Sequence, residues 1–117
     1  MAFDPEEWRK YRAMMNERIL SEDNLSLKRF MAVDNDVYKA GALDAKTKEL
    51  MGLVASLVLR CDDCVRYHVD RCIQEGVTPE EMTEAITIAM VVGGSITIPH
   101  VRQAFEAIDA FSSARGP

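Results

Sequence analysis

The sequence predicts an all-α protein: one domain, residues 1–117, in which about six helices pack as a bundle. Apolar residues recur three and four positions apart along most of the chain, which is the spacing of one helix face. Strand-like alternation of apolar and polar residues extends no further than residues 95–98. A chain of 117 residues is also long enough to bury one hydrophobic core without disulfides or metals.

The N-terminal segment, residues 1–42, is predicted to contain two helices. Asp4 can accept hydrogen bonds as an N-cap, and Pro5 suits the first position of the helix that follows. A polar break at residues 21–24 leads into a second, weaker helix, and Gly41 is expected to mark its end.

The core of the domain is predicted over residues 43–112. Its helices are bounded by N-cap acceptors, helix-starting prolines and terminal glycines. These helices are expected at about residues 44–59, 62–76, 79–94 and 99–111. The six residues at the C-terminus are expected to fray.

Two of these core helices, at about residues 44–59 and 79–94, are apolar on nearly every side. A surface helix normally has an apolar stripe roughly 100° wide, with polar residues opposite. A monomer of this size can enclose about one fully apolar helix, so a homo-oligomer is expected. A tightly packed monomer is the alternative.

Composition and charge exclude several classes of function. Fourteen basic and nineteen acidic residues give a formal net charge of -5, without a basic cluster suited to nucleic acid or an anionic membrane. The chain shows neither a secretory signal pattern nor an apolar run long enough to span a membrane. A cytoplasmic protein with reduced thiols is therefore expected. Three cysteines, two of them in a CxxC motif, favour redox or metal chemistry over structural disulfides.

Four residues form the candidate site, with the spacing Glu49-x11-Cys61-x2-Cys64-x3-His68. The reactive form of a cysteine is the thiolate, which a helix N-terminus or a nearby base makes available near neutral pH. His68 lies four residues after Cys64, so both project from one helix face about 6 Å apart. His68 can then accept the Cys64 proton. Glu49 points back toward His68 if the two helices form an antiparallel hairpin.

The aspartates between the two cysteines are the expected N-cap residues of this helix. Either Asp62 or Asp63 can accept the first backbone N–H groups. Their carboxylates also raise the pKa values of the neighbouring thiols, because a negative charge disfavours a thiolate.

A zinc site is the alternative interpretation of the same cluster. Its cysteines and histidine are good zinc ligands, and Glu49 could complete the set. Cys72 lies about 12 Å further along the helix, too far to share the ion, and is expected in the core. A haem attachment would require histidine directly after the second cysteine, where Val65 stands. We therefore predict neither a metal nor a cofactor. His100 is expected at a helix start or interface, with a place in the dithiol pocket as the alternative.

This pattern resembles the carboxymuconolactone decarboxylase superfamily, in particular its alkylhydroperoxidase D-like (AhpD-like) branch. The resemblance covers about residues 43–109 and includes the glutamate–CxxC–histidine spacing, the helix end at Gly76 and the glycine pair at residues 93–94. It implies an all-helical fold that assembles as homotrimers or homohexamers. It also implies a peroxidase or disulfide reductase that cycles between a dithiol and a disulfide.

The resemblance also implies roles for the four residues. Cys64 is similar to the cysteine that attacks a hydroperoxide and forms a sulfenic acid. Cys61 is similar to the more exposed cysteine that resolves it and meets an external thiol reductant protein. Glu49 and His68 resemble the proton relay that deprotonates Cys64. Peroxidase members carry a histidine just before the second cysteine, where this chain has Asp63.

Other classes of function stay open at this point. The lactone-decarboxylating branch of the superfamily has no need of a CxxC motif, so the intact cysteine pair favours redox chemistry. A non-catalytic redox partner or a metal-binding protein is a further alternative. Small-molecule hydroperoxides or disulfides are the expected substrates if the protein is an enzyme.

Overall fold

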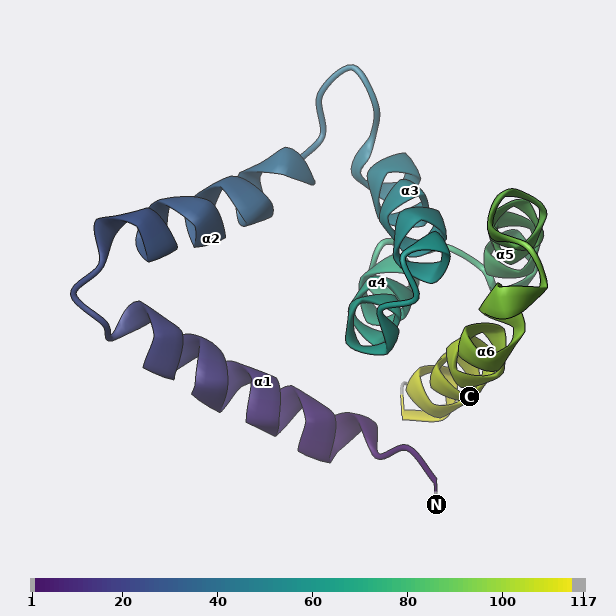
Figure 1. Ribbon diagram of the computed structural model, residues 1–117, viewed down its shortest axis with the longest axis horizontal. Helices are drawn as coiled ribbons and strands as arrows, with labels where there is room; N and C mark the ends of the chain where they lie inside the picture. Colours follow the sequence, from purple (N-terminus) through teal and green to yellow (C-terminus); the bar gives the residue numbers. More distant parts are fainter. Residues whose placement is uncertain (1, 115–117) are drawn as a thin grey trace.

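The computed structural model describes residues 2–114 and confirms an all-α fold. Over that range six α-helices and one short 3-10 helix are present, without a strand (Figure 1). The elements are α1 (Pro5–Leu20), α2 (Leu25–Val37), α3 (Ala45–Val58), α4 (Asp62–Gln74), α5 (Pro79–Gly93), η1 (Ser95–Thr97) and α6 (Ile98–Ala114).

Most of these helices begin at the capping residues that the sequence indicates. Asp4 and Asp44 accept backbone N–H groups at the starts of α1 and α3. At α5, Thr78 and Glu81 form a complete capping box, in which each side chain accepts the other residue's backbone N–H. The predicted cap of α4 was wrong, because Cys61 occupies the N-cap position in place of either aspartate.

Two predicted helix ends differ from the structure. Helix α2 ends at Val37, well before Gly41. The ammonium group of Lys48 donates hydrogen bonds to the carbonyls of Val37 and Lys39, which the helix leaves without partners at this end. Helix α6 continues to Ala114, so residues 112–114 are helical where fraying was expected. Residues 115–117 of the expected tail lie outside the described residues. Residues 95–97 form the 3-10 helix.

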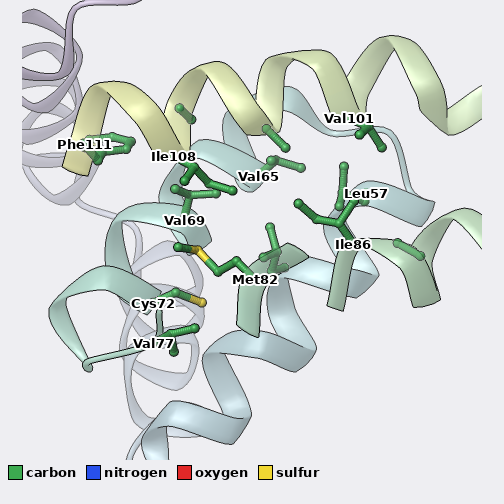
Figure 2. Close-up of a cluster of buried hydrophobic side chains, with 14 residues drawn as sticks. Leu57, Val65, Val69, Cys72, Val77, Met82, Ile86, Val101, Ile108 and Phe111 are labelled. Carbon is green, nitrogen blue, oxygen red and sulfur yellow. The ribbon is translucent and has the colours of Figure 1, made fainter. Parts of the chain in front are cut away.

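The hydrophobic core lies among α3, α4, α5 and α6. Figure 2 shows Met82 and Ile86 of α5 among side chains of α4 and α6, with Val65, Val69 and Ile108 nearby. All five of these side chains are almost completely buried. Because α3 and α4 form the hairpin that carries the candidate site, this core fixes the position of the site.

Helix α1 is attached to the core mainly through aromatic rings and arginines. The ring of Trp8 packs edge-on against Phe111, with centroids 5.6 Å apart. Arg9 forms a bidentate ion pair with Asp70 of α4, at 2.6 and 3.2 Å. Arg12 lies over the ring of Tyr67 of α4, at 4.5 Å from its centroid. These contacts place α1 against α6 and α4, close to the CxxC motif.

Helix α2, like α1, has no buried residue, and it lies apart from the α3–α6 bundle in Figure 1. Its Phe30 is 72% exposed. On the outer side of the bundle, Val91 and Val92 of α5 are also exposed. An apolar groove of about 900 Å³ lies between α3 and α5, lined by residues that include Met51, Ile88 and Val92. A single chain therefore leaves two large apolar surfaces uncovered.

Within the described residues, none of the helices combines the length and apolar character needed to cross a membrane.

Replacement of Phe111 by alanine is expected to lower the free energy of unfolding by about 3–5 kcal/mol, because a fully buried ring is removed and leaves a cavity. Urea unfolding at a fixed protein concentration measures this change. Tyr11, exposed on α1, provides the control, and its replacement by alanine should change the free energy by less than about 0.5 kcal/mol. Equal losses in the two variants would contradict the assignment of Phe111 to the core.

Candidate functional site

The turn between α3 and α4 is fixed by backbone hydrogen bonds. The N–H of Arg60 donates to the carbonyl of Leu57, and the N–H of Cys61 donates to the carbonyl of Ser56. This pair of bonds is a Schellman motif, in which the left-handed position is usually a glycine. Here Arg60 occupies it with φ 61°, a conformation that costs a residue with a Cβ roughly 1–2 kcal/mol. The Schellman motif places Cys61 at the N-terminus of α4.

Cys61 and Cys64 are joined by a disulfide, with 5.2 Å between their Cα atoms. As the N-cap residue, Cys61 accepts a hydrogen bond from the backbone N–H of Cys64 to its Sγ, at 3.3 Å. Backbone N–H groups and the helix dipole at this position favour a negative charge. After reduction, the same position stabilises a thiolate.

The exposure of the two cysteines is the reverse of what the family resemblance implies. Cys64 is exposed, whereas Cys61 is half-buried. The cause is local: Cys64 lies in the first turn of α4, and Cys61 follows directly on the turn that closes α3.

A buried Glu49–His68 pair joins α3 to α4. Nδ1 of His68 lies 2.9 Å from Oε1 of Glu49, and the two residues are 6% and 1% exposed. Gly52 makes this approach possible, because a Cβ on that residue would lie 2.5 Å from the imidazole ring. The predicted contact between Glu49 and His68 is therefore present and direct.

Two further residues extend this pair, and the sequence did not indicate either of them. The hydroxyl of Tyr38 lies 3.4 Å from Nε2 of His68. Nε of Arg71 lies 3.7 Å from Oε2 of Glu49. Burial is the main reason that the pKa of Tyr38 is raised, so its hydroxyl stays protonated near neutral pH. Within residues 2–114, no hydrogen bond joins His68 to either cysteine sulfur in the disulfide form.

Each aspartate of the CxxC motif is held by a different neighbouring helix. Asp63 accepts a hydrogen bond from the indole N–H of Trp8 on α1, at 2.8 Å. Asp62 accepts from Gln103 on α6, at 3.1 Å, and its other oxygen lies 2.7 Å from Nδ1 of His100. His100 therefore lies at a helix start, as expected, and also beside the dithiol motif. Trp8 therefore both packs against Phe111 and donates a hydrogen bond to the CxxC motif.

Cys72 lies in the core, as predicted. It is fully buried, and desolvation, followed by the nearby charge of Glu49, raises the pKa of its thiol to about 12. Among the described residues, no group of three or more histidine, cysteine or acidic side chains could hold a metal ion. The disulfide between Cys61 and Cys64 also engages two of the ligands on which a zinc site would depend.

The fold and the site together define a class of protein: an all-helical domain with a cysteine pair at a helix N-terminus and a buried glutamate–histidine pair in the same hairpin. The model of the carboxymuconolactone decarboxylase family matches residues 24–107. This chain belongs to that family. The match includes α2 and is wider than the region of the sequence resemblance. The domain division near residue 42 stays a prediction.

Individual relatives support the same assignment. A carboxymuconolactone decarboxylase family protein from Thermotoga maritima, suggested to take part in an antioxidative response, is 52% identical with a TM-score of 0.89, over 93% of this chain and 92% of that protein. An uncharacterized protein of the cox locus of Paracoccus denitrificans is 32% identical over 85 residues, which are 73% of this chain and 77% of that protein. An alkyl hydroperoxide reductase AhpD from Corynebacterium kroppenstedtii is 37% identical over 60 residues, or 51% of this chain and 34% of the reductase.

The burial of Cys72 generates a prediction about thiol reactivity. Its pKa of about 12 keeps the thiol protonated, and therefore unreactive, at all pH values well below that number. After mild reduction, iodoacetamide at about pH 8 should alkylate two cysteines in the native protein and three in denaturant, as counted by intact mass. Three alkylations in the native protein, at equal rates, would contradict the burial of Cys72.

Proposed function

We propose that this protein is a thiol-dependent peroxidase or disulfide oxidoreductase that cycles between the Cys61–Cys64 dithiol and its disulfide. The observation that carries the proposal is the CxxC pair at the N-terminus of α4, next to the buried Glu49–His68 pair. The N-terminus of α4 stabilises a thiolate of the CxxC pair, and the Glu49–His68 pair supplies an acid–base group in a fixed position. The match to part of an alkyl hydroperoxide reductase and the antioxidative response suggested for the Thermotoga relative support the same chemistry.

The oxidative half of the proposed cycle begins with the reduced protein. His68, oriented by Glu49, accepts the proton of the Cys64 thiol, and the thiolate attacks the O–O bond of a hydroperoxide. The alkoxide leaves as an alcohol with that proton, and Cys64 becomes a sulfenic acid. Cys61 then attacks the Cys64 sulfur, and hydroxide leaves with the Cys61 proton as water. The product is the disulfide present in the structure.

The reductive half requires an external thiol system, whose two thiols become a disulfide as the protein regains its dithiol. We place this cycle in the cytoplasm, where such systems keep thiols reduced. If the cycle does not react with peroxides, the same cysteine pair can exchange with small-molecule or protein disulfides. Asp63 stands where peroxidases of the family carry a histidine, so disulfide exchange is the second candidate activity.

We also propose that the protein assembles as a homotrimer or homohexamer. The support is the apolar surface of α2, where Phe30 is exposed, and the groove between α3 and α5. Burial of these two apolar surfaces between copies would remove both of them from water.

Reaction of the reduced protein with stoichiometric tert-butyl hydroperoxide tests the proposed cycle. Stopped-flow measurements, followed by intact mass and thiol counting, should show the rapid loss of two thiols. Cys64→Ser should abolish this loss. His68→Ala should slow it on the order of 100-fold, the typical contribution of a positioned acid–base group. Glu49→Gln should slow it by a smaller factor.

Cys72→Ala is the matched control for these variants, because it removes the third cysteine and should leave the two-thiol loss intact. Survival of all three thiols in the wild-type protein would eliminate the peroxidase activity. Thiol–disulfide exchange with small disulfides would then be measured. A lactone decarboxylase, in contrast, should keep its activity in the Cys64→Ser variant.

The assembly has its own test. Val92→Asp places a charge in the groove between α3 and α5, at a side chain that is 68% exposed in the single chain. Size-exclusion chromatography with light scattering should show a smaller molar mass and circular dichroism an unchanged helix content. Glu106→Lys, exposed on α6, is the charge-changing control and should keep the wild-type mass. An unchanged mass for Val92→Asp would place the subunit interface elsewhere.

A further inference from the structure

We infer that Tyr38 is a positioning residue of the proposed reaction: its hydroxyl holds Nε2 of His68 as the proton acceptor, and then accepts a hydrogen bond from that nitrogen once it is protonated. This role rests on the proposed transfer of the Cys64 proton to His68. It adds a residue at the C-terminal end of α2 to a relay that the sequence placed on α3 and α4 alone.

The tautomer of His68 follows from its partner on α3. Nδ1 lies 2.9 Å from Oε1 of Glu49, and an ionised carboxylate can only accept hydrogen bonds. Nδ1 therefore carries the hydrogen of the neutral ring, and Nε2 carries the lone pair. Nε2 is then the one ring atom that can take a proton from a thiol.

Tyr38 lies at that lone pair. Its hydroxyl oxygen is 3.4 Å from Nε2 of His68. Burial, followed by the charges of Asp34 and Glu49, raises the pKa of Tyr38, so the hydroxyl keeps its hydrogen and can donate it to the nitrogen. The contact is longer than a typical hydroxyl hydrogen bond of about 2.7–2.8 Å. It therefore orients the ring and is weak enough to be given up when a thiol proton arrives.

The other contacts of the imidazole set its plane and leave its direction open. Tyr67 packs edge-on against the ring, with centroids 5.0 Å apart, and Gly52 lies close to it without a Cβ. A half-turn of the ring about its bond to Cβ would keep the same shape and exchange both nitrogens for carbons. Partners at both nitrogens, Glu49 on one side and Tyr38 on the other, favour a single orientation.

Tyr38 serves first as a donor and then as an acceptor during proton transfer. The S–H bond of Cys64 breaks, its electron pair stays on sulfur, and the proton bonds to Nε2 of His68. The Tyr38 hydroxyl turns and accepts from the new Nε2–H, while Nδ1–H still donates to Glu49. Hydrogen bonds to a charged group are roughly twice as strong as neutral ones. The hydroxyl therefore stabilises the imidazolium more than the neutral ring, and favours the thiolate–imidazolium pair.

A polar pocket gives the turned hydroxyl an acceptor for its hydrogen. The pocket has a volume of about 350 Å³, and its lining includes Tyr38, Glu49, Asn35 and Lys39. A pocket of this size and polarity admits water, which can accept the hydrogen while the oxygen faces His68.

Nitrogen NMR of the isotope-labelled, oxidised protein tests the tautomer and the contact. The chain has two histidines, so His100→Gln identifies the signals of His68. At a pH where the ring is neutral, the wild-type protein should show a protonated Nδ1 and an unprotonated Nε2. Tyr38→Phe removes only the hydroxyl and should move the Nε2 resonance toward that of an unbonded nitrogen. A protonated Nε2 in the wild-type protein, or a resonance that does not move, would overturn the inference.

Alkylation of Cys64 tests the effect on the thiolate. In Cys61→Ser, iodoacetamide reports the Cys64 thiol, because the buried Cys72 thiol has a pKa of about 12. Addition of Tyr38→Phe should slow alkylation at neutral pH on the order of fivefold, the typical effect of one hydrogen bond, and move the pH profile to higher pH. In a His68→Ala background, Tyr38→Phe should have no further effect.

Tyr67→Phe is the matched control for Tyr38→Phe. Within residues 2–114, Tyr67 contacts the imidazole through its ring, without a hydrogen bond from its hydroxyl. Its removal should leave the alkylation rate of Cys64 unchanged, and circular dichroism should show the same helix content in both variants. Equal rates for the two variants, or an equal effect of Tyr38→Phe with and without His68, would show that Tyr38 does not act through the imidazole.

Neither measurement requires turnover of a peroxide. The expected NMR and alkylation results, together with thiols that survive tert-butyl hydroperoxide, would remove the peroxidase activity and leave the role of Tyr38 in place. Rapid loss of two thiols to the peroxide at the same rate in wild type and Tyr38→Phe, with unchanged alkylation, would remove the role of Tyr38 alone.

Discussion

The buried contact between Glu49 and His68 is the interaction on which the arrangement of the site depends. A carboxylate that is 1% exposed would be strongly destabilising without a partner, so α3 and α4 must keep the register that brings the imidazole to it. That register requires a residue without a Cβ at Gly52. It also sets where the turn between the two helices falls, and hence where Cys61 meets the N-terminus of α4.

The helices and the central pair were predictable because their signals are local. The capping box of Thr78 and the spacing from Glu49 to His68 depend on residues within one helix or one hairpin. The contacts of Tyr38, Trp8 and His100 were not predictable, since their partners lie 30, 55 and 38 residues away along the chain. A single sequence shows such residues without showing what they meet. The N-cap was mistaken because aspartate is the stronger capping residue, and the Schellman motif overrode that preference.

The two aspartates of the CxxC motif have hydrogen-bond partners that change the role of their charges. From the sequence, Asp62 and Asp63 are simply two negative charges beside a dithiol. In the structure, α6 engages Asp62 and α1 engages Asp63. Helices α1 and α6, which are distant from the motif in sequence, therefore hold it in place from two sides. The short loop at the start of α4 gains rigidity from both, and its carboxylates serve as anchoring points.

Tyr38 links the buried pair to the least supported part of the chain. Tyr38 follows directly on α2, a helix that buries no residue of its own. Its hydroxyl contacts the ring nitrogen of His68 opposite the one that faces Glu49. If neighbouring copies cover α2, they also hold Tyr38 in place against the imidazole. Dilution that separates the subunits would then weaken the contact between Tyr38 and His68 as well as uncover the surface of α2. Catalytic competence and quaternary structure would share one equilibrium, and specific activity would depend on protein concentration.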